Sequence, residues 1–215
     1  MIDYKGVIFD LDGTLLDSLQ VWKKVDKIFF EKINLNIPFD YEKNIKGMTL
    51  LQCAQYTKKI CGIDDNIEDI IKQWKEIAYD EYKNNVGLKS GAYEYILFLK
   101  ENNIKMGIAT ACEKELYEIC LKNKGIYNFF DTIVDSTLVD KDKSHPDIYN
   151  LCAKNLGIKN KDIIVFEDIL DGINGAKKAN MRVYCVYDKN SCENLEDLLK
   201  ASDEYITDFR ELILR

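Results

Sequence analysis

Short runs of apolar residues recur along the chain, and each has the length of a single strand. The runs are rich in β-branched residues and end on acidic or small ones. Continuous apolar runs of this kind predict strands that are buried on both faces, as in a parallel sheet. The predicted strands occupy residues 6–10, 105–110, 132–135, 163–167 and 182–187.

Stretches with helical spacing of apolar positions separate these runs. They cover residues 93–102, 114–124, 147–156 and 173–179. Strands that alternate with helices predict an α/β fold, a doubly wound parallel sheet with helices on both faces and right-handed crossovers.

The interval between the first two strands breaks this alternation. No strand is expected between residues 16 and 88, which instead contain amphipathic segments at 21–33, 50–60 and 67–82. We therefore expect a small helical domain at residues 16–88, inserted into an α/β core formed by residues 1–15 and 89–215.

Composition narrows the class of protein. The 215 residues are 47% hydrophobic and 31% charged, which is typical of a globular chain, and the net charge of −7 argues against nucleic acid as the main partner. No apolar run is long enough to span a membrane. Seven cysteines without a C-x-x-C pair, and no signal-peptide pattern at the start, favour reduced thiols and a cytoplasmic location. We expect a monomer or weak dimer.

Acidic residues stand at the ends of two predicted strands. Asp10 and Asp12 end the first strand, and Glu167 and Asp168 end the fourth. Alternate residues of a strand share a face, and the carboxyl edge of a parallel sheet is where ligands bind. Converging carboxylates suit a hard cation such as Mg2+. The alternatives are a solvated turn for the first pair and helix capping for the second.

A hydroxyl and an amine come from the neighbouring segments. Thr110 ends the second strand just before a predicted helix, where a hydroxyl and free backbone amides make an anion site. A helix-capping role explains Thr110 equally well. Lys143 lies in the loop after the third strand. Most lysines are solvated surface residues, so only this position makes Lys143 a candidate site residue.

The order of these motifs resembles the haloacid dehalogenase superfamily, in its branch with a helical cap after the first strand. The resemblance rests on residues 9–18, Phe-Asp-Leu-Asp-Gly-Thr-Leu-Leu-Asp-Ser, and on Phe166-Glu167-Asp168 with the glycine and alanine pattern up to Met181. It covers essentially the whole chain. Within that superfamily the second acid of the first motif marks phosphoryl-transfer members, so Asp12 points to a phosphatase or a phosphomutase.

The resemblance also implies a role for each site residue. Asp10 is expected to be the nucleophile that forms an aspartyl-phosphate, and Asp12 the general acid and base. Mg2+ is expected between the Asp10 carboxylate, the Asp12 carbonyl and Asp168, with Glu167 nearby.

The same resemblance implies how the transferred phosphate is held. Thr110 and Lys143 are expected to bind its oxygens, and the backbone amides of Leu11 and Ala111 are expected to help. In the cap, Trp22, Lys46 and Thr49 are the candidate substrate contacts.

The chain departs in the cap from the mutase members of the superfamily that it resembles. β-Phosphoglucomutase-like relatives carry a histidine and an arginine at the positions of Trp22 and Leu50, and residues 16–88 contain neither residue type. We therefore expect a Mg2+-dependent phosphatase of a small phosphorylated metabolite, a sugar phosphate or a similar monoester. A phosphomutase is the alternative. A phospho-accepting signalling domain is a remote one, because its site Asp would stand alone on a middle strand without a helical insertion.

Overall fold

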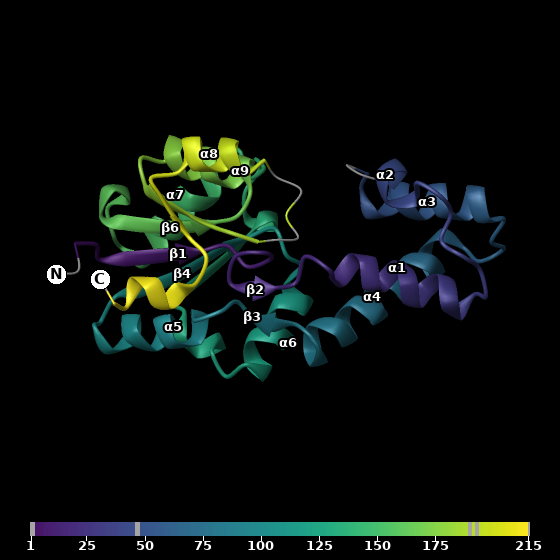
Figure 1. Ribbon diagram of the computed structural model, residues 1–215, viewed down its shortest axis with the longest axis horizontal. Helices are drawn as coiled ribbons and strands as arrows, with labels where there is room; N and C mark the ends of the chain where they lie inside the picture. The colour runs from purple at the N-terminus through teal and green to yellow at the C-terminus, as the bar shows by residue number, and fades with distance from the viewer. Residues whose placement is uncertain (1–2, 46–47, 189–190, 192–193, 215) are drawn as a thin grey trace. The chain divides into compact units, whose positions relative to one another are not determined.

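The computed structural model describes residues 3–45, 48–188, 191 and 194–214. It divides the chain into two compact units. Residues 1–19 and 86–215 form one, which we call the α/β unit, and residues 20–85 form the other, which we call the helical unit. Each is described by itself (Figure 1).

The α/β unit is built on a six-stranded sheet in which every pairing is parallel. Its strand order is β5-β4-β1-β6-β7-β8, which confirms the predicted doubly wound arrangement. The edge strand β8 was not predicted, because three residues are too few to show a period. The strands are β1 (Gly6–Phe9), β4 (Lys105–Thr110), β5 (Thr132–Asp135), β6 (Ile163–Glu167), β7 (Arg182–Val186) and β8 (Glu204–Ile206).

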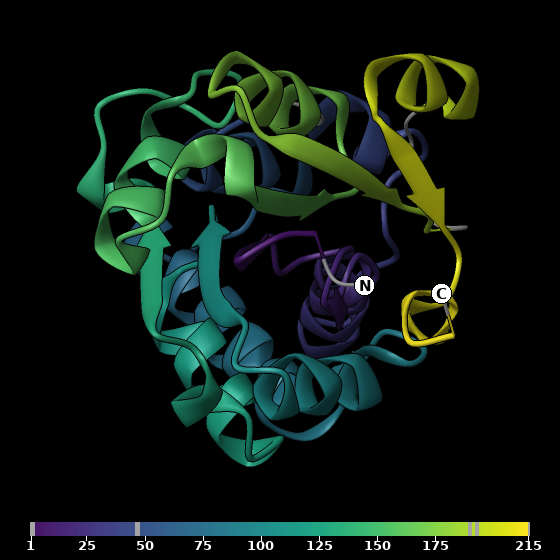
Figure 2. The same ribbon diagram turned by 90° about the vertical axis from the view of Figure 1, so that its left-hand side faces the viewer.

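Helices cover both faces of this sheet (Figure 2). Helices α7, α8 and α9 pack on one face, where they enclose Ile8 and Val165 of the central strands. Helix α5 and the 3-10 turn η4 lie on the other. The bounds are α5 (Ala92–Glu101), α6 (Lys114–Asn123), η1 (Tyr127–Phe129), η2 (Ser136–Leu138), α7 (Asp147–Leu156), η3 (Asn160–Asp162), α8 (Leu170–Lys178), α9 (Leu195–Ala201) and η4 (Phe209–Leu212).

An aromatic cluster anchors the two central strands on the α5 face. Phe9 of β1 stacks on Phe166 of β6 with ring centroids 5.2 Å apart, and Tyr95 meets Phe166 edge-on at 5.6 Å. Phe209 packs against the same rings and is 1% exposed. Buried aromatic pairs add stability beyond their area. They hold the ends of β1 and β6, and so the acidic residues that follow, in one place.

A short antiparallel ribbon corrects one expectation. Strand β2 (Leu16–Asp17) pairs with β3 (Gly87–Leu88), so the prediction that residues 16–88 contain no strand is wrong. Two-residue strands carry no periodic pattern, which is why the sequence did not show them. The ribbon belongs to the α/β unit, and the helical unit therefore begins and ends inside the range predicted for it.

The helical unit consists of α1 (Val21–Lys32), α2 (Tyr41–Ile45), α3 (Leu50–Cys61) and α4 (Ile67–Asn84). Helix α1 packs on α4 and α3 on α4. Phe29 and Trp74 meet edge to face between α1 and α4, with centroids 5.5 Å apart. Helix α3 begins with a capping box and ends at Gly62 in the left-handed conformation.

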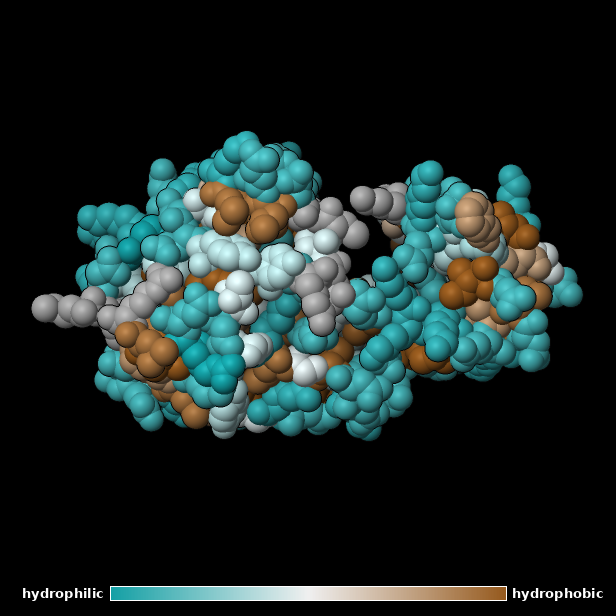
Figure 3. All heavy atoms as spheres, viewed as in Figure 1, coloured by the Kyte–Doolittle hydropathy of each residue, from teal (hydrophilic) through white to brown (hydrophobic). Residues whose placement is uncertain are grey.

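Polar side chains dominate the face shown in Figure 3, and apolar ones form separate patches on it. Among the residues that the structure describes, no helix combines the length and the apolar composition needed to cross a membrane.

Candidate active site

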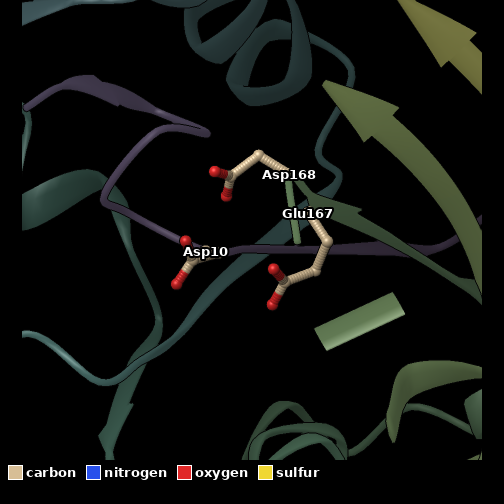
Figure 4. A group of neighbouring side chains, drawn as sticks. All are labelled: Asp10, Glu167 and Asp168. Atoms are coloured by element: carbon tan, nitrogen blue, oxygen red, sulfur yellow. The ribbon is translucent and has the colours of Figure 1, made fainter. Parts of the chain in front are cut away.

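Three carboxylates meet at the carboxyl edge of the sheet (Figure 4). Asp10 directly follows β1, and Glu167 and Asp168 stand at the end of β6, the parallel neighbour of β1. The backbone N–H of Asp10 donates to the carbonyl of Phe166 at 3.0 Å, which joins the two strand ends. Each residue offers one carboxylate oxygen, and these atoms lie within 4.8 Å of one another. Asp10, Glu167 and Asp168 therefore form one buried acidic cluster.

The turn after β1 is shaped to fit Asp168. The carbonyl of Leu11 accepts hydrogen bonds from the backbone amides of residues 14–16, which curls the chain tightly. Gly13 adopts a φ of +88°, and a side chain there would overlap the Asp168 carboxylate. The Thr14 hydroxyl donates to Oδ1 of Asp168 at 2.8 Å. The first motif thus holds a carboxylate that lies 154 residues away in the chain.

Lys143 supplies the cation that faces this cluster. Its Nζ lies 2.6 Å from Oδ1 of Asp10 and also forms an ion pair with Glu167. Burial disfavours its charged form, but the two carboxylates outweigh burial and hold the pKa of Lys143 above its usual value. Gly175 of α8 sits against the carbonyl of Lys143 so closely that a side chain there would overlap it. The position of the Lys143 loop therefore depends on that glycine.

Negative charge exceeds positive charge in the site. Burial, with repulsion from Glu167 and Asp168, raises the pKa of Asp10 well above its usual value although Lys143 opposes this. Burial and repulsion from Glu167 raise the pKa of Asp168 to about 7. Among the described residues, Lys143 is the ammonium group in ion-pair contact with the cluster, and Lys89, which also lowers the pKa of Asp168, is itself paired with Asp188. These cations do not balance three buried carboxylates.

Two oxygens of the cluster have no partner within the described part of the chain. Oε2 of Glu167 and Oδ2 of Asp168 are buried and accept no hydrogen bond. Buried carboxylate oxygens are costly unless a donor or a cation engages them. The donor set is all oxygen, which is what a hard divalent ion such as Mg2+ prefers. The residues present therefore fit a divalent metal.

Asp12 lies beside this cluster but outside it. Its carboxylate accepts a hydrogen bond from the Ser18 hydroxyl at 2.6 Å and is partly exposed. The buried group of possible ligands contains the carboxylates of Asp10, Glu167 and Asp168 without that of Asp12. The backbone carbonyl of Asp12, which the resemblance implies as a metal ligand, therefore stays an expectation.

The candidate phosphate-binding residues differ in exposure. Thr110 ends β4, which pairs with β1, and its hydroxyl accepts a hydrogen bond from the Cys112 amide at 3.0 Å. It is 1% exposed and lies at the same edge of the sheet as Asp10. Ala111 is exposed, whereas the Leu11 side chain is fully buried. Helix α6 follows, with Glu113 as its N-terminal capping residue.

Three hydroxyl side chains at the site were not assigned from the sequence. Thr14 donates to Asp168, and Ser18 donates to Asp12, as described above. Tyr149 of α7 donates to Oε1 of Glu167 at 2.7 Å. Burial, followed by the negative charge of Glu167, raises the pKa of Tyr149 well above its usual value, so its hydroxyl stays a donor. Thr14 and Ser18 could have been found from their place in the first motif, but nothing local marks Tyr149.

The candidate substrate residues belong to the helical unit. Trp22 lies in the first turn of α1 and is 43% exposed. Thr49 caps α3, where its hydroxyl accepts from the Gln52 amide at 3.3 Å and its own N–H donates to the Gln52 side chain at 2.8 Å. The Thr49 hydroxyl oxygen therefore already caps the N-terminus of α3. Lys46 lies outside the described residues.

Comparison with known proteins gives a family match along most of the chain. Residues 7–186 match the family described as Haloacid dehalogenase-like hydrolase. This range contains all three carboxylates of the cluster and Lys143. It also contains the whole helical unit.

Curated relatives and solved structures agree with that match. The chain is 26% identical to the "Phosphorylated carbohydrates phosphatase" of Thermotoga maritima, over 85% of each chain. It is 28% identical to the "Beta-phosphoglucomutase" of Bacillus subtilis, over 82% of this chain and 80% of that one. The crystal structure of a "putative beta-phosphoglucomutase" from Thermotoga maritima superposes with a TM-score of 0.87 at 24% identity, covering 98% of this chain and 97% of that one.

Proposed function

Because the chain belongs to the haloacid dehalogenase-like hydrolase family, we propose that it is a Mg2+-dependent phosphatase of small phosphate monoesters. The observation that carries this proposal is the ion pair of Asp10 and Lys143 inside the buried acidic cluster. It supplies a carboxylate nucleophile, a fixed cation beside it, and oxygens for a metal.

Asp10 is the proposed nucleophile. One of its carboxylate oxygens attacks phosphorus, the bond from phosphorus to the ester oxygen breaks, and an aspartyl-phosphate forms. A nucleophilic carboxylate must be ionised, and burial alone works against this. Lys143 favours the ionised form through its contact with Oδ1.

Asp12 is the proposed general acid and base. Its proton goes to the departing ester oxygen, which leaves as an alcohol. Asp12 then takes a proton from water, and that water attacks phosphorus and breaks the bond to Asp10. The products are inorganic phosphate and free Asp10. The Ser18 hydrogen bond orients the Asp12 carboxylate, and partial exposure gives it access to protons from solvent.

The Asp10 and Asp168 carboxylates and the Asp12 carbonyl are the proposed Mg2+ ligands, with Glu167 beside them. A bound divalent cation would offset the repulsion between these carboxylates and an incoming phosphate and stabilise charge in the transition state. Thr110, Lys143 and the amides of Leu11 and Ala111 are the proposed contacts to the phosphate oxygens.

The proposed substrate is a small phosphorylated metabolite, with the helical unit as the domain that selects it. Curated relatives include a phosphorylated carbohydrates phosphatase and "(DL)-glycerol-3-phosphatase 2" of Arabidopsis thaliana, which is 25% identical over 95% of this chain and 88% of that one. These names support the reaction class. Trp22, Lys46 and Thr49 stay the proposed contacts to the leaving group.

Hydrolysis is favoured over phosphoryl transfer between two positions of one sugar. A mutase must hold a second phosphate group while its intermediate turns, and residues 20–85 contain no arginine or histidine for that task. The similarity to a β-phosphoglucomutase keeps the mutase as the alternative. Activation by a sugar bisphosphate without release of phosphate would identify a mutase.

Release of inorganic phosphate from a panel of phosphate monoesters tests the proposal. We expect release with Mg2+ and none with excess EDTA. Asp10→Asn should abolish release, whereas Asp171→Asn, an exposed aspartate three residues after Asp168, should not change it. Undiminished turnover by folded Asp10→Asn protein would reject the assignment of the nucleophile.

A further inference from the structure

A buried tyrosine reaches the acidic cluster from the apolar core of the α/β unit. Tyr149 lies in the first turn of α7 and is fully buried. Its ring belongs to the core on the α7 face of the sheet, together with Ile8, Val165 and Ile173. Phenylalanine would fill the same apolar space, so the role of the Tyr149 hydroxyl depends on what this hydroxyl binds.

The Tyr149 hydroxyl donates to the Glu167 carboxylate. The Tyr149 oxygen lies 2.7 Å from Oε1 of Glu167, which is the length of a hydrogen bond to a charged acceptor. Lys143 forms its ion pair with the same Oε1 and reaches Oδ1 of Asp10 with the same Nζ. A buried chain of contacts therefore runs from Tyr149 through Glu167 and Lys143 to Asp10.

Three neighbours fix the Glu167 carboxylate in the cluster. Tyr149 and Lys143 both engage Oε1. Gly172 of α8 lies so close to this carboxylate that a side chain at Gly172 would overlap it. A glutamate side chain has considerable rotamer freedom, so the place of its carboxylate depends on such contacts.

Lys143 alone gives Glu167 a shared contact. Its ammonium group is divided between Asp10 and Glu167. The Tyr149 hydroxyl, by contrast, has its hydrogen bond with Glu167 and comes from a ring that the core holds in place. Tyr149 therefore supplies the more rigid of the two contacts to Oε1.

We propose that Tyr149 is a positioning residue, which acts through Glu167 to set how tightly the acidic cluster holds a divalent cation. The inference rests on the proposed function, because it takes the cluster to be a Mg2+ site. Hydrogen bonds that orient the carboxylates of a metal site typically account for about 10- to 100-fold in metal affinity or activity. Tyr149 is fully buried, so it is not placed to touch a substrate.

A tyrosine with a purely structural hydrogen bond provides a matched control. Tyr117 of α6 is also buried, and its hydroxyl donates to the carboxylate of Asp135 at 3.3 Å. Asp135 ends β5 and is not a member of the acidic cluster. Loss of the Tyr117 hydroxyl should therefore affect stability without affecting metal binding.

Mg2+ binding in the absence of substrate tests the proposal. Isothermal titration calorimetry compares wild type, Tyr149→Phe and Tyr117→Phe, each titrated with magnesium chloride. We expect Tyr149→Phe to bind Mg2+ about tenfold more weakly than wild type. Tyr117→Phe should bind it as wild type does. Urea unfolding checks that both variants are folded.

A second background shows whether the effect passes through Glu167. Residues that act as a unit give non-additive effects, so Tyr149→Phe should change Mg2+ affinity by less than about twofold in Glu167→Gln protein. Phosphate release gives an independent readout. Tyr149→Phe should raise the Mg2+ concentration for half-maximal release by about tenfold and leave the KM of the monoester unchanged.

The outcomes separate this inference from the proposed function. Equal Mg2+ affinity of Tyr149→Phe and wild type, or a tenfold loss that persists in Glu167→Gln, would overturn the inference alone. Wild-type protein that binds no Mg2+ would overturn the inference and the proposed metal together. Mg2+ binding that depends on Tyr149 in a protein that releases no phosphate would support the inference and reject the proposed phosphatase.

Discussion

The Nζ atom of Lys143 lies 2.6 Å from Oδ1 of Asp10, although 133 residues separate them in the chain. The two meet because β1 lies in the middle of the sheet and the loop that carries Lys143 is pressed against α8 at Gly175. This pair fixes one oxygen of Asp10 and partly offsets three buried carboxylates. Folding and chemistry therefore depend on the same ammonium group.

Loss of the Lys143 charge should impair both stability and activity. Lys143→Met leaves the buried carboxylates without their cation, and we expect the free energy of unfolding to fall by about 3 kcal/mol near neutral pH. Phosphate release should fall by about a hundredfold or more. Urea unfolding and phosphate assays measure the two effects. Lys141→Met, an exposed lysine in the same loop, should change neither.

Mg2+ should stabilise the folded protein, and more so at higher pH. The pKa of Asp168 is raised to about 7, so protons compete with a cation below that pH. Without metal, the raised pKa favours folding below the ordinary carboxyl pKa, and this contribution is lost as the pH rises through about 7. We expect Mg2+ to raise the melting temperature more at about pH 8 than at about pH 6. An equal shift in Asp168→Asn would contradict the proposed ligand.

Gly175 should be intolerant of a side chain for a steric reason. Gly175→Ala would gain about 1 kcal/mol of helix propensity, but its Cβ would overlap the Lys143 carbonyl. We expect a net loss of about 2 kcal/mol in the free energy of unfolding and weaker Mg2+ binding. Gly87→Ala is the control, since no atom lies within 4 Å of its added Cβ. If Gly175→Ala leaves the free energy of unfolding unchanged, the Lys143 loop can move aside without loss of stability, and the steric explanation is wrong.

Asp26 should make the helical unit less stable as the pH rises. The pKa of Asp26 is raised to about 7. Its favourable contribution to the free energy of unfolding is therefore fully present below the ordinary carboxyl pKa and is lost as the pH rises through about 7. Asp26→Asn should remove this decline, and its free energy of unfolding should exceed that of the wild type by about 1 kcal/mol near pH 8. The difference is small because the Asp26 side chain is partly exposed. Urea unfolding followed by tryptophan fluorescence reports this unit alone. Matching pH profiles for variant and wild type would exclude the effect.

The sequence predicted the parts of the molecule that depend on local pattern. The runs at residues 6–10 and 163–167 end where β1 and β6 end, within one residue. Because the two strands were predicted to be parallel, Asp10 and Asp168 were expected at the same edge of the sheet. Helix α8 begins at Leu170, three residues before the predicted start at residue 173. The prediction began late because Asp171 and Gly172 are typical loop residues, although they lie in the first turn of the helix.

Features that depend on tertiary packing were not predictable from one sequence. Tyr149 looks like any apolar-face tyrosine of a helix, and only the fold brings it to Glu167. The β2–β3 ribbon joins segments on either side of the helical unit and has no period to detect. Asp26 and Trp74 line one pocket of the helical unit but lie on helices far apart in the chain, so this pocket appears only in the folded unit.

The most direct test of the proposed chemistry is the mass of the protein during turnover of para-nitrophenyl phosphate. Its leaving group needs no general acid, so Asp12→Asn should form the aspartyl-phosphate but hydrolyse it slowly. We expect acid-quenched Asp12→Asn protein to carry one added phosphoryl group, located on Asp10 by peptide mapping, and Asp10→Asn to carry none. A phosphoryl group on another residue, or turnover by Asp10→Asn, would contradict the account.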